Sequence, residues 1–174
     1  MLFRSVWGVL LTVGAASGGT DPLAPLRAMG GQPRVGEAGS APAQFAPVVG
    51  MPGLQAQLIA ATRAGEPVLL DLYADWCISC KLMERDVFPH ATVVAALKGV
   101  RLLRADVTAN NAADKALLAH FGLFGPPSLL FFDRRGEERR DFRIQGERDA
   151  PALAAHVLRF LARLPSRIAR PPEA

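Results

Sequence analysis

The stretch DLYADWCISCK, residues 71–81, decides the fold and contains the only two cysteines of this 174-residue chain. It begins inside a nearly continuous apolar run, residues 68–73, which is typical of a buried central strand. The residues after the first cysteine predict a helix. At such a strand-to-helix junction, free backbone N–H groups and the helix dipole favour the thiolate of Cys77. Cys80 lies one helical turn further on, where it can attack a mixed disulfide formed by Cys77. This spacing indicates dithiol–disulfide exchange.

Two other roles for the cysteine pair remain open. A structural disulfide across so short a loop would remove little chain entropy. A structural zinc site would need about four ligands, and the three histidines, His90, His120 and His156, are scattered along a chain with no second cysteine pair. We therefore favour redox exchange, which requires no metal and no cofactor.

The overall composition fits one domain with a full hydrophobic core, because 50% of the residues are hydrophobic. The formal net charge is +4, and the arginines that produce it are dispersed. In the small cluster at residues 134–140, arginines are interleaved with glutamates and no aromatic residue is present. That pattern is typical of a solvated hairpin, so we expect no nucleic-acid partner.

The N-terminal region predicts export followed by a linker. Residues 1–16 are mostly apolar, and Arg4 is their only charged side chain, but they are shorter than the roughly 20 residues of a bilayer span. They fit a secretory signal peptide, the remnant of a transmembrane helix, or a buried helix of a soluble protein. We favour the first two, either of which sends the following domain across the inner membrane, tethered by or exported through this segment. Residues 17–52 predict a flexible Gly/Pro/Ala-rich linker, residues 53–164 the folded domain, and residues 165–174 a disordered tail.

Strand and helix patterns alternate from the edge of the domain at residue 45 onward. Strands are expected at residues 45–49, 68–73, 100–107, 128–132 and 139–144. Helices are expected at residues 54–64, 78–87, 91–97, 112–121 and 150–164. This order predicts an α/β fold, a three-layer sandwich in which helices cover both faces of a mixed sheet.

Three blocks of sequence carry a family resemblance: LDLYADWC at residues 70–77, VTAN at residues 107–110 and PSLLFFD at residues 127–133. In this order, and with the CxxC motif, they resemble the C-terminal periplasmic domain of the DsbD family of membrane thiol:disulfide interchange proteins, which has a thioredoxin-like fold. The resemblance covers about residues 45–164.

The resemblance implies a periplasmic protein-disulfide reductase. In that family, electrons pass from cytoplasmic thioredoxin through a transmembrane domain to this domain. It then reduces an N-terminal periplasmic domain, which serves disulfide isomerases and cytochrome c maturation. The implied partners are therefore a membrane-embedded thiol donor and periplasmic thiol–disulfide proteins as acceptors. The N-terminal domain and nearly all of the transmembrane domain have no counterpart here, so we expect either a fragment of a longer protein or a stand-alone tethered relative.

The resemblance also implies roles for four residues around the cysteines. Cys77 would be the attacking thiol and Cys80 the resolving one. Asp71 and Glu84 match acids that raise the pKa of the cysteines, since a nearby carboxylate disfavours a second negative charge. Such a carboxylate can also accept the proton of Cys80. Asp71 lies in an apolar strand, where a carboxylate without a role is costly, whereas Glu84 also fits an ordinary helix surface.

Three further residues are expected to contact a bound partner. Trp76 would shield Cys77 and offer an apolar contact, although a packing role is the alternative. Pro127 is the candidate cis-proline, because cis peptide bonds cost little only before proline, and in thioredoxin-like folds it faces the CxxC motif. Pro126 would stiffen that loop.

The remaining residues near the motif have ordinary roles in this interpretation. Phe121 and Phe124 fit either the core or a docking surface, and we favour the core. Lys81 is expected on the solvated face of the helix. The dipeptide Ile78-Ser79 adds no positive charge, so the first cysteine is only moderately acidified, which suits a reductant. The alternatives are a thioredoxin-like binding module for exported proteins and an oxidant that donates its disulfide.

Overall fold

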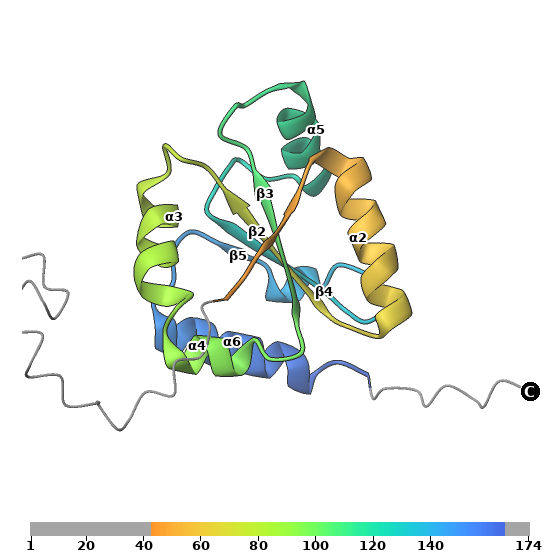
Figure 1. Ribbon diagram of the computed structural model, residues 1–174, viewed down its shortest axis with the longest axis vertical. Helices are drawn as coiled ribbons and strands as arrows, with labels where there is room; N and C mark the ends of the chain where they lie inside the picture. The colour runs from red at the N-terminus through yellow and green to blue at the C-terminus, as the bar shows by residue number, and fades with distance from the viewer. Residues whose placement is uncertain (1–42, 166–174) are drawn as a thin grey trace, which may run out of the picture. The chain divides into compact units, whose positions relative to one another are not determined.

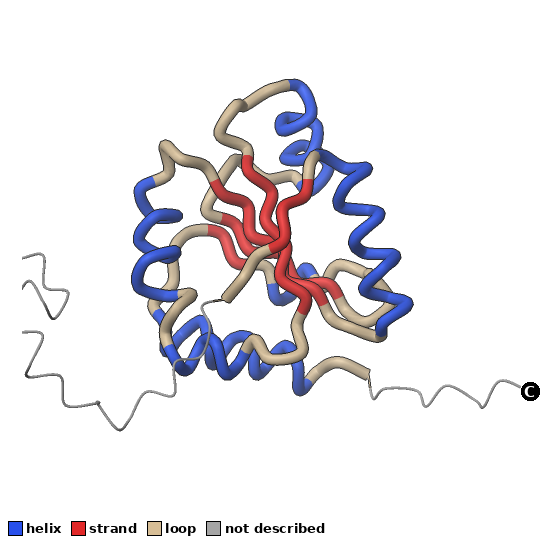
Figure 2. The backbone as a smooth tube through the Cα atoms, in the orientation of Figure 1, coloured by secondary structure: helices blue, strands red, loops and turns tan. Residues whose placement is uncertain are grey.

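Strand β2 (Val68–Tyr73) is the central strand of the fold, and all 6 of its residues are buried. The computed structural model describes residues 43–165, and in it β2 belongs to a five-stranded sheet with the strand order β1-β3-β2-β4-β5. The sheet lies at the centre, with helices around it (Figures 1 and 2). A strand that is apolar on both faces favours this central place, because both of its faces are then covered.

The sheet is mixed, as the sequence predicts. Strand β3 (Arg101–Asp106) pairs in parallel with β2 and with β1 (Ala46–Val48). Strand β4 (Ser128–Phe132) pairs antiparallel with β2, and β5 (Ile144–Gln145) pairs antiparallel with β4. The register places Asp71 of β2 beside Arg104 of β3. The predicted α/β fold is confirmed.

Helices cover both faces of the sheet and complete three layers (Figure 1). Their bounds are α2 (Gly50–Ala64), α3 (Ile78–Leu82), η1 (Met83–Val87), α4 (Ala91–Ala96), α5 (Ala112–Phe121), η2 (Arg140–Phe142) and α6 (Ala150–Ala162). Helices α2 and α5 pack together, and α6 packs against α4 and η1. Leu70 and Leu72 of β2 belong to the core that includes residues of α2 and α5, whereas Leu69 belongs to the core under α4 and α6.

Local capping residues explain where two of these helices begin and end. Asn111 begins α5 with a capping box: its side chain accepts hydrogen bonds from the backbone of Ala113 and Asp114, and the side chain of Asp114 accepts one from the backbone of Asn111. Gly65 ends α2 in the left-handed conformation, with φ of 67°, which glycine adopts without steric cost.

Two predicted elements differ from the observed ones. The helix predicted at residues 78–87 changes from α3 into the π-helix η1, in which the N–H of Phe88 donates to the carbonyl of Met83 at 2.9 Å. The strand predicted at residues 139–144 is wrong: η2 replaces most of it, and β5 is short. The turn buries Phe142, whose ring lies 5.5 Å from the ring of Phe160 on α6. Burial of this aromatic ring is favoured over a longer edge strand.

The folded region begins before the boundary expected at residue 53. Strand β1 is the short strand predicted at residues 45–49, and α2 already begins at Gly50. The segment at residues 1–16, most of the linker and nearly all of the C-terminal tail lie outside the described residues. Between residues 43 and 165, no helix has the length and apolar character needed to cross a membrane.

Candidate active site

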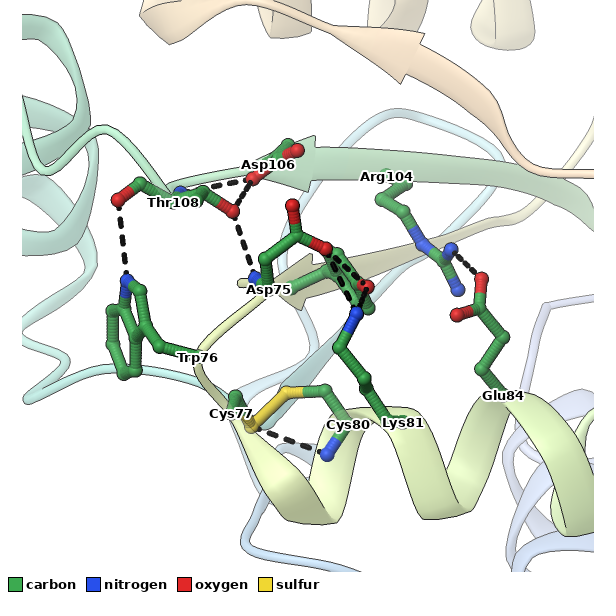
Figure 3. A network of polar contacts seen from close by, with 10 residues as sticks. Asp75, Trp76, Cys77, Cys80, Lys81, Glu84, Arg104, Asp106 and Thr108 are labelled. Atoms are coloured by element: carbon green, nitrogen blue, oxygen red, sulfur yellow. Dashed lines mark hydrogen bonds and ion pairs between the residues drawn. A yellow bond between two sulfur atoms is a disulfide. The ribbon is translucent and has the colours of Figure 1, made fainter.

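The two cysteines form a disulfide at the beginning of α3 (Figure 3). Cys77 is the N-cap residue of this helix, in an extended backbone conformation. Its sulfur accepts a hydrogen bond from the backbone N–H of Cys80 at 3.1 Å. Cys77 is 7% exposed and Cys80 is 3% exposed, so both residues are buried. The first turn of the helix therefore offers Cys77 a backbone donor, as the strand-to-helix junction predicts.

Arg104 joins the two predicted carboxylates. Its Nε lies 2.9 Å from Oδ2 of Asp71, and its Nη1 lies 2.5 Å from Oε1 of Glu84. Figure 3 shows the side chains of Arg104 and Glu84 pointing toward each other. The three residues come from β3, β2 and η1, so three elements converge here. The two acids are thus brought together through a cation that the sequence interpretation missed.

The environment of Asp71 sets its protonation near neutral pH. Burial raises the pKa of Asp71 to about 6, while the charge and hydrogen bond of Arg104 act to lower it and the charge of Glu84 acts to raise it. At pH 7 this carboxyl is therefore mostly ionised but close to its pKa. A group in that condition can accept a proton and release it again.

Trp76 lies on the surface beside the cysteines and is held by the loop that follows β3 (Figure 3). Its side chain is 59% exposed, and its indole Nε1–H donates to the carbonyl oxygen of Thr108 at 3.1 Å. The hydroxyl oxygen of Thr108 also accepts the backbone N–H of Asp75 at 2.8 Å. Thr108 is a second residue whose role the sequence interpretation missed. Its position in the VTAN block is the signal that could have identified it.

Lys81 is about half exposed, as predicted, but it is bound at its charged end. Its Nζ lies 2.9 Å from Oδ1 of Asp75 and 3.0 Å from the hydroxyl of Tyr73. The hydrogen bonds to Tyr73 and Asp75 raise the pKa of Lys81, so it stays a cation at neutral pH. Lys81 therefore ties α3 to the end of β2 and does not act as a base.

The peptide bond between Pro126 and Pro127 is cis, which confirms the predicted cis-proline. Strand β4 begins immediately after it, and its Ser128 lies opposite Leu72 of β2. The start of β4 therefore lies at the edge of the sheet where β2 leads into the cysteine motif. Contact of Trp76 and of both prolines with a substrate stays a prediction.

The expectation for Phe124 is wrong, whereas that for Phe121 is confirmed. Phe121 is buried against the core, but Phe124 is fully exposed, three residues later and just before the proline loop. Helix α5 ends between them, at Gly122 in the left-handed conformation. The change of direction after the helix leaves Phe124 in solvent. Ile78 and Trp76, next to the cysteines, are also exposed.

Comparison with known proteins supports the fold and the cysteine chemistry. A family model described as Thioredoxin-like matches residues 51–134. The thiol:disulfide interchange protein DsbD 2 of Pseudomonas aeruginosa is 47% identical over 152 residues, which cover 87% of this chain and 26% of that protein. The thiol:disulfide interchange protein DsbD of Ralstonia nicotianae is 44% identical over 154 residues, which cover 88% of this chain and 25% of that protein. The chain thus spans about a quarter of the length of these curated relatives.

A solved structure matches one whole domain of such a protein. The crystal structure of the C-terminal domain of Neisseria meningitidis DsbD in the oxidised form superimposes with a TM-score of 0.55 at 32% sequence identity. The match covers 63% of this chain and 95% of that domain. The similarity therefore extends over nearly the full length of that domain.

Proposed function

The chain belongs to the DsbD family of thiol:disulfide interchange proteins, in which it corresponds to the thioredoxin-like C-terminal domain, and we propose that it is a protein-disulfide reductase. It passes electrons through Cys77 and Cys80 to exported protein partners. The observation that carries this proposal is the Cys77–Cys80 disulfide at the N-terminus of α3, with the backbone N–H of Cys80 directed at the sulfur of Cys77.

The exchange proceeds in two steps from the dithiol form. The thiolate of Cys77 attacks one sulfur of the partner's disulfide, so a mixed disulfide forms and the partner's other sulfur leaves and takes up a proton. The thiol of Cys80 then gives up its proton, and its sulfur attacks Cys77. The mixed disulfide breaks, the Cys77–Cys80 disulfide forms, and the partner leaves as a dithiol. The partner thereby gains two electrons and two protons.

Asp71 is the proton acceptor for Cys80 in this proposal. It is buried on the strand that leads to the cysteines, and its pKa of about 6 leaves it ionised at neutral pH. Its negative charge also disfavours a persistent thiolate at Cys80. A thiol pair whose thiolates are not strongly stabilised is a better reductant, because the reduced form gives up its electrons more readily. Glu84 acts on Asp71 by its charge and through its ion pair with Arg104.

The partners follow from the chemistry and the family. We assign the electron donor to a membrane-embedded thiol protein domain, and the acceptors to periplasmic proteins that carry reducible disulfides. The site of action is the periplasmic face of the bacterial inner membrane, with residues 1–16 as a signal peptide or membrane anchor. The support is the apolar character of those residues and the name of the relatives, thiol:disulfide interchange protein. Trp76 and the loop of Pro126 and Pro127 contact the acceptor.

A trapping experiment tests the shuttle directly. The Cys80→Ala variant of the dithiol protein, incubated with a periplasmic extract, is expected to retain a mixed disulfide through Cys77 that dithiothreitol releases. The control is Cys77→Ala combined with Cys80→Ala, which leaves no attacking thiol. Equal adducts in both variants, or none in either, would rule out the shuttle.

Two further measurements separate the proposed reductase from its alternatives. A reductase is expected to accelerate the reduction of insulin by dithiothreitol, whereas a non-covalent binding module would not. A titration against glutathione distinguishes a reductant from an oxidant. The pair is expected to resist reduction by glutathione, and ready reduction would identify a disulfide donor instead.

A further inference from the structure

Arg104 lies beside Asp71 because of the parallel register of β2 and β3. Residues that are neighbours across two strands leave the sheet on the same face. Two residues earlier on each strand, Leu69 and Leu102 pack in the core that includes residues of α4, η1 and α6. Asp71 and Arg104 continue that layer toward the end of β2 that leads to the cysteines. The ion pair is therefore part of the sheet's construction and does not depend on flexible loops.

The guanidinium of Arg104 is also enclosed by other side chains. The Arg104 side chain is 19% exposed, and its guanidinium carbon lies 4.6 Å from the centre of the Tyr73 ring and 4.9 Å from that of Phe45. Both distances are typical of cation–π contacts. Together with Asp71 and Glu84, these rings form a fixed environment for a planar cation. Such a site suits arginine better than lysine, because the guanidinium donates in two directions at once.

Building on the disulfide exchange proposed above, we propose that Arg104 is a positioning residue for the resolving step: it keeps Asp71 ionised and oriented to accept the proton of Cys80. The Nε–H of Arg104 holds Oδ2 of Asp71, and Glu84 holds the Nη1 end of the same guanidinium. Glu84 on the surface therefore fixes the orientation of Arg104, and Arg104 fixes the orientation of the buried Asp71.

The charges around Asp71 explain why this cation matters. Charged and titratable groups near this end of β2 include Arg104 on β3, Glu84 on η1, Lys81 on α3 and Tyr73 on β2 itself. Lys81 is bound to Tyr73 and Asp75, and the neighbour of Asp71 on β4 is the apolar Leu129. Burial and Glu84 both favour the protonated form of Asp71, and Arg104 opposes them. Without Arg104, the carboxyl would already hold a proton at neutral pH.

The test follows the protonation of Asp71 in the 174-residue chain with its disulfide intact. The readout is the carbon-13 chemical shift of the Asp71 carboxyl against pH, assigned by loss of the signal in Asp71→Asn. In Arg104→Gln the pH midpoint of the Asp71 titration is expected to rise by about one pH unit or more. In Arg104→Lys, which keeps the charge, the rise is expected to be clearly smaller. The matched control is Arg101→Gln, since Arg101 lies on the same strand and pairs with Glu66 at 2.8 Å, and it is expected to leave the midpoint unchanged.

A further variant keeps the test decisive if Arg104→Gln folds poorly. Glu84→Gln changes a half-exposed residue of η1 and removes a negative charge near Asp71. The midpoint of Asp71 is therefore expected to fall, opposite to the shift in Arg104→Gln. A purely structural role of the cluster would not move the midpoint in opposite directions. Unchanged midpoints in both variants would overturn the proposal.

The resolving step itself is measured with Ellman's reagent. The second thionitrobenzoate is released when Cys80 attacks the mixed disulfide on Cys77, and stopped-flow absorbance follows its rate against pH. In Arg104→Gln the rate at pH 7 is expected to fall about tenfold and its pH midpoint to rise with that of the carboxyl, while Arg104→Lys restores most of the rate. If the wild-type protein is active and Arg104→Gln has the same rate and pH midpoint, the role of Arg104 is overturned but the proposed reductase is not. A wild-type chain that reduces neither insulin nor Ellman's reagent would overturn the proposed reductase and this inference with it.

Discussion

The backbone N–H of Cys80 points at the sulfur of Cys77, 3.1 Å away, in the first turn of α3. In the dithiol form, the same donor faces a thiol that can ionise, and a hydrogen bond to a thiolate stabilises it. Cys80 is the more buried of the two residues, and burial disfavours a thiolate. The two thiols are therefore chemically distinct, although only two residues separate them.

This asymmetry predicts selective alkylation of the reduced protein. At pH 7, iodoacetamide is expected to modify Cys77 at least about tenfold faster than Cys80, because the thiolate is the reactive species. Mass spectrometry of tryptic peptides after short labelling times, with the second thiol blocked after denaturation, measures the ratio. Equal rates at the two positions would contradict the assignment of Cys77 as the attacking thiol.

The raised pKa of Asp71 predicts how stability depends on pH. The folded protein keeps Asp71 protonated up to a pKa of about 6, whereas the ordinary pKa of this side chain is 3.8. Between these pH values the folded protein therefore binds more protons than the unfolded chain. Stability from this group is therefore greatest below about pH 4 and decreases as pH rises through 6. The full effect is about 2–3 kcal/mol.

Asp71→Asn removes this dependence, because asparagine does not titrate. Between pH 4 and pH 7 the wild type loses this contribution and the variant does not. The free energy of unfolding of Asp71→Asn is therefore expected to rise by about 2–3 kcal/mol relative to that of the wild type. Urea unfolding followed by circular dichroism at several pH values measures the difference. Glu66→Gln, which changes an ion pair remote from the cysteines, is the control. A difference that stays flat with pH would show that Asp71 titrates normally.

Much of the fold was predictable because its information is local. The buried run at residues 68–73 is apolar on both faces, and Asn111, Gly65 and Gly122 mark helix ends by their own conformational preferences. The cysteine motif follows from the junction of strand and helix. These features need no knowledge of distant contacts.

The features that the sequence did not predict depend on contacts between distant residues. Nothing in the local sequence distinguishes Arg104 from the other arginines. Only the register of β3 against β2 places it beside Asp71, from which it is 33 residues away in the sequence. Phe124 is as apolar as Phe121, and only the turn at Gly122 decides which ring is buried. At residues 139–144, where a strand was predicted, η2 forms instead and Phe142 packs against Phe160 of α6.

The two phenylalanines near the end of α5 predict opposite mutational outcomes. Phe121→Ala removes a buried ring that packs against Phe132 at 6.0 Å, and is expected to lower the free energy of unfolding by about 3–5 kcal/mol. Phe124→Ala removes a fully exposed ring and is expected to change it by less than about 0.5 kcal/mol. Chemical unfolding of both variants under the same conditions tests the pair. A large loss of stability in Phe124→Ala would mean that this ring is buried after all.

Trp76 predicts a defect that depends on the size of the substrate. Its ring is more than half exposed and is held by Thr108, so it is placed to contact a protein partner without supporting the core. Trp76→Ala is expected to slow insulin reduction about fivefold, or about 1 kcal/mol, while the reaction with Ellman's reagent keeps its rate. Ile59→Ala, which removes a similarly exposed side chain from α2, is expected to alter neither reaction. If Trp76→Ala slows both reactions equally, the indole acts on the cysteines themselves, and the contact with the partner must come from other residues.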